Sequence, residues 1–290
     1  MPKPAFFIIG AQKCGTSWLA RNLGRHPQVF MPRGEAHFFD KRYKYAKGEQ
    51  WYEQRFEGAG AGMLIGEKTP EYLWANGYAG DGHLPNVHQN LYRYNPRAKL
   101  LVVLRDPVAR AVSAINHLIK DGVISPFEDI DRLLTKGEYD RIRNHGLLEK
   151  GRYLEQLQAY REYFSEEQMR VYIFEEDFAP DPHQGLADVC RFLGVDPSHR
   201  FRNVERRVNG SCRSTLGLLL AYYVRMPGIR QAAKGLDRYL LRHVAPAKAT
   251  IADRTRRYLE GYYREDNERL FEFLGRRIGA WETTDTAATS

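Results

Sequence analysis

Short continuous runs of hydrophobic residues alternate with helical patterns along most of the chain. The runs typical of buried strands are residues 5–9, 63–66, 99–104 and 169–174, with a shorter one at 28–30. The helical patterns start at Thr16 and recur over 107–120, 126–135, 149–163 and 183–193. Strands separated by helices predict a three-layer α/β fold with a central parallel sheet and helices on both faces.

The end of the chain has a different pattern. Beyond residue 200 it is helical throughout and ends in a long amphipathic helix near 250–274. Without repeats or a clear linker, we expect one domain over residues 1–282, followed by a disordered tail at 283–290. The basic stretch at about 200–245 forms a helical subregion, either packed with solvated arginines or serving as a lid for an anionic or lipid-borne acceptor.

Composition narrows the class of protein. With 43% hydrophobic and 28% charged residues, the chain is ordinary globular protein and not a disordered or fibrous one. No apolar run reaches the ~18 residues of a membrane span, and the first residues do not resemble a signal peptide. Three cysteines without a CxxC pair predict a reducing compartment, the cytoplasm, and no zinc site. The net charge of +8 favours anionic partners or a solubilising surface.

Residues 10–17 carry the most informative chemistry. Gly10 and Gly15 bound a turn between the first strand and the first helix, which presents backbone N–H groups and a helix N-terminus to an anion. Thr16 and Ser17 add hydroxyl donors. An ordinary strand-to-helix turn is the alternative, but the pattern favours a phosphate-binding loop.

This loop differs from the Walker A loop of kinases and NTPases. Thr16, and not lysine, follows the second glycine, and the lysine lies inside the loop at Lys13. The strand at 99–104 ends in Arg105 and not in the aspartate of a magnesium site, although Asp106 is adjacent. A metal-dependent phosphoryl transferase is therefore disfavoured.

Two motifs together resemble the PAPS-dependent sulfotransferases. Residues 10–19 have the form GxxKxGT[ST]xL of that family's 5′-phosphosulfate loop, and residues 105–113 have the form RxPxxRAxS of its 3′-phosphate motif. The stretches 34–40 (GEAHFFD) and 66–73 (GEKTPEYL) are most similar to the heparan-sulfate-type and bacterial branch. The resemblance spans at least residues 5–195 and implies a P-loop-like fold.

The resemblance also implies the residues that bind the donor, PAPS, and the product, PAP. These are Gly10, Gln12, Lys13, Cys14, Gly15, Thr16, Ser17, Trp18, Arg105 and Ser113, with Asn209, Gly210 and Arg213 from a loosely matching loop. Lys13, Lys68 and Arg105 each follow a different predicted strand. Ligands of an open α/β sheet lie at the carboxyl ends of its strands, so we expect these three cations to converge there.

Sulfuryl transfer to a hydroxyl needs a general base and neutralisation of the leaving phosphate. By the resemblance, Lys13 contacts the leaving oxygen and Lys68 assists near the sulfonate. Glu35 and His37 lie on one side of the chain if their segment is extended. The resemblance assigns the base to Glu35 with His37 in support, although histidine is the usual base near neutral pH.

Alternatives remain at each position of this acceptor site. Glu35 is also compatible with a solvated surface carboxylate, and His37 with a core histidine packed against the phenylalanines that follow it. In the small-molecule branch of the family a later histidine is the base, which keeps His83 and His88 open.

The sequence thus predicts an enzyme that transfers a sulfuryl group from PAPS to a hydroxyl of a glycan, lipid or small molecule, without a metal. A magnesium-dependent P-loop nucleotide kinase is the second hypothesis. A non-enzymatic polyanion binder is the third, although interleaved basic and aromatic motifs for nucleic acid are absent from the sequence.

Overall fold

The computed structural model describes residues 2–75, 82–135, 145–205, 222 and 249–282. The chain divides into two compact units, one made of residues 1–106, 152–206 and 265–290, the other of residues 107–151 and 207–264. Most of the basic subregion at 200–245 lies outside the described residues, as does the tail at 283–290. The single domain expected over residues 1–282 therefore stays a prediction.

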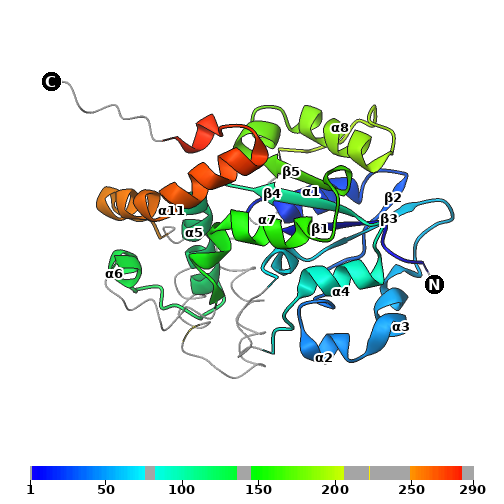
Figure 1. Cartoon of the computed structure of the whole chain (residues 1–290), viewed down its shortest axis with the longest axis horizontal. Coiled ribbons are helices and arrows are strands. Elements are labelled where there is room, and N and C mark those ends of the chain that lie inside the picture. Colours follow the sequence, from blue (N-terminus) through cyan, green and yellow to red (C-terminus); the bar gives the residue numbers. More distant parts are fainter. Residues whose placement is uncertain (1, 76–81, 136–144, 206–221, 223–248, 283–290) are drawn as a thin grey trace, which may run out of the picture. The chain divides into compact units, whose positions relative to one another are not determined.

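The first unit is built on a parallel sheet with the strand order β2-β3-β1-β4-β5 (Figure 1). The strands are β1 (Phe6–Gly10), β2 (Val29–Phe30), β3 (Leu64–Lys68), β4 (Lys99–Leu104) and β5 (Met169–Ile173). Every residue of the central strand β1 is buried, as expected where helices cover both faces of a parallel sheet. The predicted α/β fold with a central parallel sheet is confirmed.

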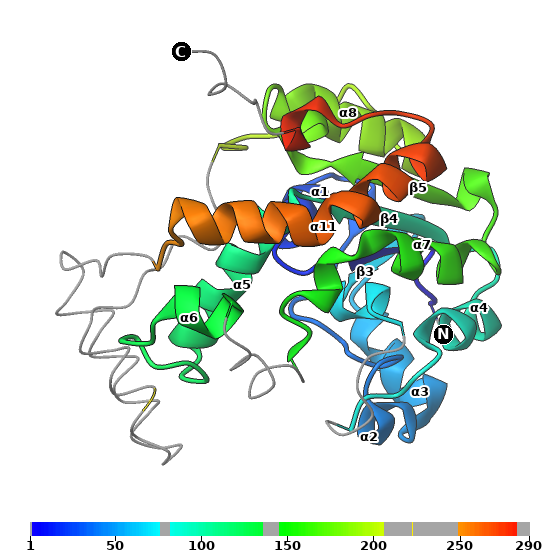
Figure 2. The ribbon, with the colours of Figure 1, turned by 60° about the vertical axis from the view of Figure 1, so that its left-hand side comes forward.

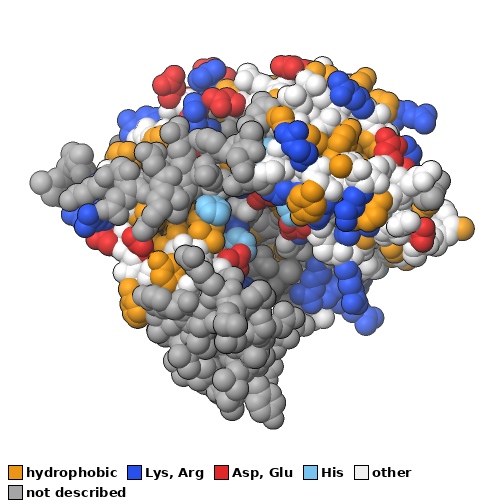
Figure 3. Space-filling view, turned by 90° about the horizontal axis from the view of Figure 1, so that it is seen from below, with side chains coloured by type: hydrophobic (Ala, Val, Ile, Leu, Met, Phe, Trp, Pro, Cys, Tyr) orange, Lys and Arg blue, Asp and Glu red, His pale blue; other side chains and the backbone are white. Residues whose placement is uncertain are grey.

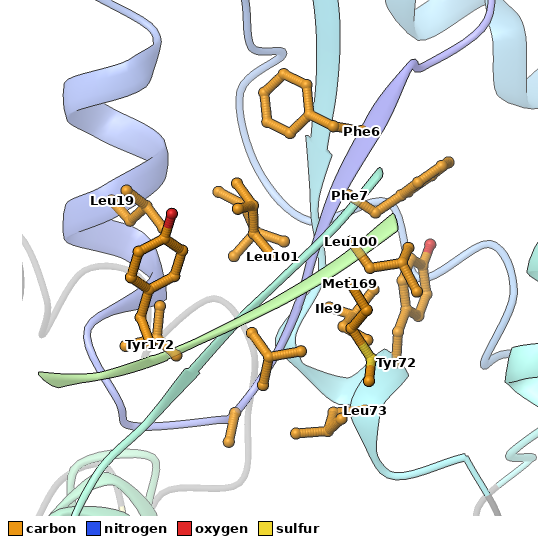
Figure 4. Close-up of a cluster of buried hydrophobic side chains, with 14 of the residues drawn as sticks. Phe6, Phe7, Ile9, Leu19, Tyr72, Leu73, Leu100, Leu101, Met169 and Tyr172 are labelled. Atoms are coloured by element: carbon orange, nitrogen blue, oxygen red, sulfur yellow. The ribbon is translucent and has the colours of Figure 1, made fainter. Parts of the chain in front are cut away.

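Helices α1 (Thr16–Leu23) and α7 (Tyr153–Arg161) lie on opposite faces of this sheet in both Figures 1 and 2. Side chains alternate between the two faces along each strand. In Figure 4, Leu101 and Tyr172 point to the side of Leu19 on α1, whereas Leu100 points to the side of Tyr72. The two faces bury separate layers of one hydrophobic core.

The segment between β2 and β3 departs from the prediction. The sequence analysis placed no helix in residues 31–62, but α2 (Arg42–Tyr45), α3 (Gly48–Glu53) and a 3₁₀ turn (Gln54–Phe56) form there. These elements are short and mostly exposed, so they leave little periodic pattern in the sequence. They are anchored by Tyr52 and Phe56, both fully buried.

The remaining elements of the first unit extend its layers. They are a 3₁₀ turn (Pro70–Leu73), α4 (Val87–Tyr94), a second 3₁₀ turn (Glu166–Gln168), a π-helical turn (Phe174–Phe178), α8 (Pro182–Leu193), the last part of α11 (Asp253–Leu274) and a final 3₁₀ turn (Gly279–Trp281). The helix α4 was not predicted from the sequence.

The second unit is helical where it is described. It contains α5 (Pro107–Lys120), α6 (Ile130–Thr135), a turn (Glu149–Gly151) and the first part of α11 (Asp253–Leu274). Arg110 of α5 is fully buried and its guanidinium donates to the carbonyl of Leu147. Among the described helices of the whole chain, none is long and apolar enough to cross a membrane.

Gly185 and Gly261 both lie in helices but differ in the space around them, so their alanine variants test how tightly the two helices are packed. A Cβ at Gly185 of α8 would overlap the carbonyl oxygen of Asp177 and lie 2.6 Å from Phe178 Cδ1, whereas a Cβ at Gly261 of α11 meets nothing within 4 Å. We expect Gly185→Ala to lower the free energy of unfolding by about 1–3 kcal/mol through overpacking. Gly261→Ala should raise it by about 0.5–1 kcal/mol through helix propensity. Urea unfolding of both variants checks this, and equal effects of the same sign would contradict it.

Candidate functional site

The loop between β1 and α1 has the backbone of an anion-binding turn. Lys13 and Gly15 adopt positive φ angles of 71° and 92°. A Cβ at Gly15 would lie 2.9 Å from Phe174 Cδ2, so glycine is required there by both conformation and space. As the N-cap of α1, Gly15 offers no side-chain oxygen to the first-turn N–H groups. Such groups suit a phosphate at the helix N-terminus.

Gln12 and Trp18, two of the residues predicted to bind PAPS, form hydrogen bonds with neighbouring segments of the chain. The Gln12 amide donates from Nε2 to Glu71 Oε1 at 2.6 Å. The Trp18 indole donates from Nε1 to the carbonyl of Val204 at 2.7 Å. Thr16 is buried at the start of α1. The loop is thereby tied to the turn after β3 and to the segment that follows α8.

Arg105 lies directly after β4, as predicted, and is joined to the loop through Tyr153. The Tyr153 hydroxyl donates to the Arg105 carbonyl at 2.8 Å and lies 3.6 Å from the Sγ of buried Cys14. The Arg105 Nε is 3.6 Å from Glu175 Oε1. Glu175 also accepts from the Trp281 indole at 3.2 Å. One tyrosine thus links the two segments that carry the predicted nucleotide motifs.

The other residues predicted to bind PAPS or PAP lie elsewhere in the chain. Ser113 is on α5 in the second unit, and its placement relative to Arg105 stays a prediction. Asn209, Gly210 and Arg213 lie outside the described residues.

A carboxylate–lysine pair forms beside the loop. Lys68 is the last residue of β3, and its side chain is only 13% exposed. Its Nζ donates to Glu35 Oε1 at 2.5 Å and to Ser17 Oγ at 3.3 Å. The Glu35 side chain is 33% exposed, so it is partly shielded but still reachable from solvent. Glu35, Lys68 and the phosphate loop therefore meet at the carboxyl ends of β1 and β3.

His37 joins this pair from its other side. Its Nε2 is 3.1 Å from Glu35 Oε2 and its Nδ1 is 2.9 Å from Oδ2 of the fully buried Asp40. The histidine is not a core residue, because its side chain is 24% exposed. The extended geometry assumed for this segment is wrong, since His37 has a φ of 52°. Glu35 and His37 meet with His37 in a left-handed backbone conformation.

These contacts shift the pKa values of Glu35 and His37 in opposite directions. Burial opposes the charged form of Glu35, but His37 and Lys68 outweigh it and lower the Glu35 pKa to about 2. Burial also opposes the charged form of His37, but hydrogen bonds to Asp40 and Glu35 outweigh it and raise the His37 pKa to about 9. At neutral pH the site therefore holds an ionised carboxylate between two cations.

The alternative histidines lie in other surroundings. His88 is on α4, with its ring 5.9 Å and 5.3 Å from those of Tyr160 and Tyr163, and burial lowers its pKa. His83 is buried, pairs through its backbone with Lys41 and has its ring 6.0 Å from that of Trp74. The histidine that contacts Glu35 directly is His37.

Three residues of the site were missed by the sequence analysis. Asp40 follows His37 by three residues, and that spacing in a turn was its only local signal. Tyr153 and Glu175 lie 48 and 69 residues beyond Arg105 and Asp106, the residues they contact, so no short motif includes them.

The two shifts predict a pH window for stability. The raised His37 pKa contributes stability that is complete below pH 6.5 and lost as the pH rises through about 9. The lowered Glu35 pKa contributes stability that is complete above pH 4.5 and lost as the pH falls through about 2. We expect NMR titration of the His37 ring, assigned with His37→Gln, to show a midpoint near 9. A midpoint at the ordinary 6.5 would contradict these contacts.

Comparison with known proteins identifies the family. Residues 3–211 match the family described as Sulfotransferase domain. The chain is 29% identical over 286 residues to heparan sulfate glucosamine 3-O-sulfotransferase 3B1 of Mus musculus, covering 96% of this chain and 65% of that protein. Heparan sulfate glucosamine 3-O-sulfotransferase 5 of Mus musculus is 28% identical over 203 residues, or 67% of this chain and 54% of that protein. The chain therefore spans about half to two thirds of the length of these relatives.

A solved structure extends the likeness over nearly the whole chain. The sulfotransferase from Alicyclobacillus acidocaldarius is 28% identical, with a TM-score of 0.69 over 97% of this chain and 99% of that one. The sulfotransferase domain from the curacin biosynthetic pathway, 15% identical with a TM-score of 0.50, shares the fold. The resemblance to the heparan-sulfate-type and bacterial branch is confirmed, and the chain belongs to the sulfotransferase family.

Proposed function

We propose that this protein is a PAPS-dependent sulfotransferase that transfers a sulfuryl group to a hydroxyl acceptor and releases PAP. The observation that carries the proposal is the contact of Glu35 with Lys68 next to the phosphate loop. It combines a proton acceptor, a cation for the leaving group and an anion-binding turn at one edge of the sheet. In-line displacement needs these three groups together.

The proposed reaction is a single displacement. Glu35 takes the proton of the acceptor hydroxyl, whose oxygen bonds to sulfur while the bond from sulfur to the 5′-phosphate oxygen breaks. Lys13, Lys68 and the loop N–H groups neutralise the charge that develops on that phosphate oxygen. His37, protonated below its pKa of about 9, orients Glu35 and is not the base. Arg105 and Ser113 bind the 3′-phosphate.

The acceptor proposed is a hydroxyl of a glucosamine-containing glycan. The relatives at 28–29% identity are named heparan sulfate glucosamine 3-O-sulfotransferases, and one of them matches over 96% of this chain. The net charge of +8 suits an anionic glycan. Residues 31–62 and the basic subregion are the segments expected to determine the acceptor.

The other hypotheses receive less support. The family match favours sulfuryl transfer over the magnesium-dependent kinase. The same match favours an enzyme over a non-enzymatic polyanion binder. On the face seen in Figure 3, the described Lys and Arg side chains lie in separate groups among acidic and hydrophobic ones. The absence of a metal stays a prediction, and activity that withstands EDTA would support it.

Nucleotide binding tests the 3′-phosphate site. Calorimetric titration with PAP and with ADP, without Mg²⁺, compares two nucleotides with two phosphate groups each, of which PAP carries one at the 3′ position and ADP carries both at the 5′ position. We expect PAP to bind at least about 10-fold more tightly, because a charge-assisted hydrogen bond contributes about 1.5–3 kcal/mol. Arg105→Ala should weaken PAP binding by about 10–100-fold and leave ADP nearly unchanged. Equal affinity for both nucleotides, or a requirement for Mg²⁺, would overturn the proposal.

Turnover tests the base. With PAPS and heparan sulfate oligosaccharides as substrates, we expect Glu35→Gln to lower kcat by about 10²–10⁴-fold, because the amide cannot accept the proton. PAP affinity should stay within about 2-fold of the wild type, since Glu35 is not proposed to bind the nucleotide. His88→Gln, on α4, is the matched control and should retain kcat. Full activity of Glu35→Gln would remove the carboxylate from the mechanism.

A further inference from the structure

Two hydroxyl groups that the proposed mechanism does not use lie directly behind the segment carrying Glu35 and His37. We propose that the hydroxyls of Thr69 and Tyr72 are positioning groups that hold residues 35–38 so that Glu35 faces Lys68. The buried carboxylate of Glu67 fixes the direction of the Thr69 hydroxyl. This inference rests on the proposed function.

The hydroxyls bind three consecutive backbone N–H groups. Those of Ala36 and His37 donate to Thr69 Oγ1 at 3.1 Å and 3.3 Å, and that of Phe38 donates to the Tyr72 hydroxyl at 3.0 Å. Residues 35–37 belong to no helix or strand. The N–H groups of this stretch are therefore bound by side chains that follow β3, while the Ala36 carbonyl accepts from Lys44 Nζ at 2.7 Å.

Glu67 leaves Thr69 only one arrangement. A hydroxyl has one hydrogen and two lone pairs, and both lone pairs of Thr69 are used by N–H donors. Its hydrogen then goes to Glu67 Oε1 at 2.6 Å. Glu67 is fully buried, and its Oε2 accepts from the Tyr52 hydroxyl at 3.3 Å. With both oxygens occupied, the glutamate is a rigid acceptor behind Thr69.

The backbone held in this way is unfavourable on its own. His37 has a φ of 52°, in the left-handed region that residues with a Cβ rarely adopt. Such a conformation persists only where its surroundings hold it. It brings His37 Nε2 to 3.1 Å from Glu35 Oε2. Without its N–H partners the segment would relax, and the carboxylate would move away from Lys68.

The residues of this arrangement lie close together in the sequence. Lys68 is the last residue of β3, Thr69 is the next residue, and Tyr72 lies in the following 3₁₀ turn. The Tyr72 carbonyl accepts from the buried Tyr160 hydroxyl at 2.6 Å, which anchors that turn to α7. One short stretch thus places the lysine and holds the segment of the carboxylate that pairs with it.

Substitution of Thr69 tests the inference. Thr69→Val keeps the shape and removes the hydroxyl, and we expect kcat to fall at least about 10-fold because Glu35 is displaced. PAP affinity should stay within about 2-fold, and Thr69→Ser should restore kcat to within about 3-fold. Thr255→Val is the matched control, because Thr255 is also fully buried but its Oγ1 has no hydrogen-bond partner. Its kcat should match that of the wild type.

Amide exchange adds a readout that does not depend on activity. We expect the N–H groups of Ala36 and His37 to exchange faster in Thr69→Val than in the wild type or Thr69→Ser. Tyr72→Phe should accelerate exchange at Phe38 and also lower kcat, which decides the matter if Thr69→Val does not fold.

The outcomes separate the two proposals. Wild-type protein without sulfuryl transfer would overturn the function, whereas the exchange data would still test the positioning of the segment. An active wild type whose Thr69→Val and Tyr72→Phe variants keep kcat and normal exchange would overturn the positioning role alone. Loss of kcat in Thr69→Ser equal to that in Thr69→Val would also overturn it.

Discussion

The ion pair between Glu35 and Lys68 is the interaction on which the rest of the site depends. Its 2.5 Å contact joins a partly shielded carboxylate to a largely buried ammonium, and each would be costly without the other. Lys68 is fixed because β3 pairs with the central strand. Glu35 lies outside any strand and depends on side-chain contacts for its position. How precisely the two side chains are placed therefore depends mainly on Glu35, whose segment has no regular secondary structure.

Protonation in this site follows from the same contacts. His37 would be the better base by its ordinary pKa of 6.5, but its two carboxylate partners make it a cation at neutral pH. Glu35 is correspondingly the acceptor available for a proton, although its pKa of about 2 makes it a weak one. In the proposed reaction, the sulfonate of PAPS also interacts with Lys68. This second anion would weaken the effect of Lys68 on Glu35 and raise the Glu35 pKa at the step in which the acceptor hydroxyl loses its proton.

The sequence predicted the sheet well because its strands are buried on both faces and appear as continuous apolar runs. Strand β4 was predicted with its bounds, Lys99–Leu104. The missed helices α2, α3 and α4 have four to eight residues, too few for a reliable helical period. The assumed extended form of residues 35–37 failed for a different reason. Hydroxyls from beyond β3 bind this segment with His37 in a left-handed conformation that local preferences would not choose.

Contacts supplied by tertiary packing also limit what motifs can predict about the site. The motifs indicated Glu35, His37 and Lys68, and the structure brings these three together. Whether His37 is a base or a cation depends on Asp40, which is fully buried and pointed at it by the fold. A motif thus predicts which groups meet, whereas the charge each group carries depends on partners that tertiary packing supplies. In the proposed reaction, those partners favour glutamate over histidine as the proton acceptor.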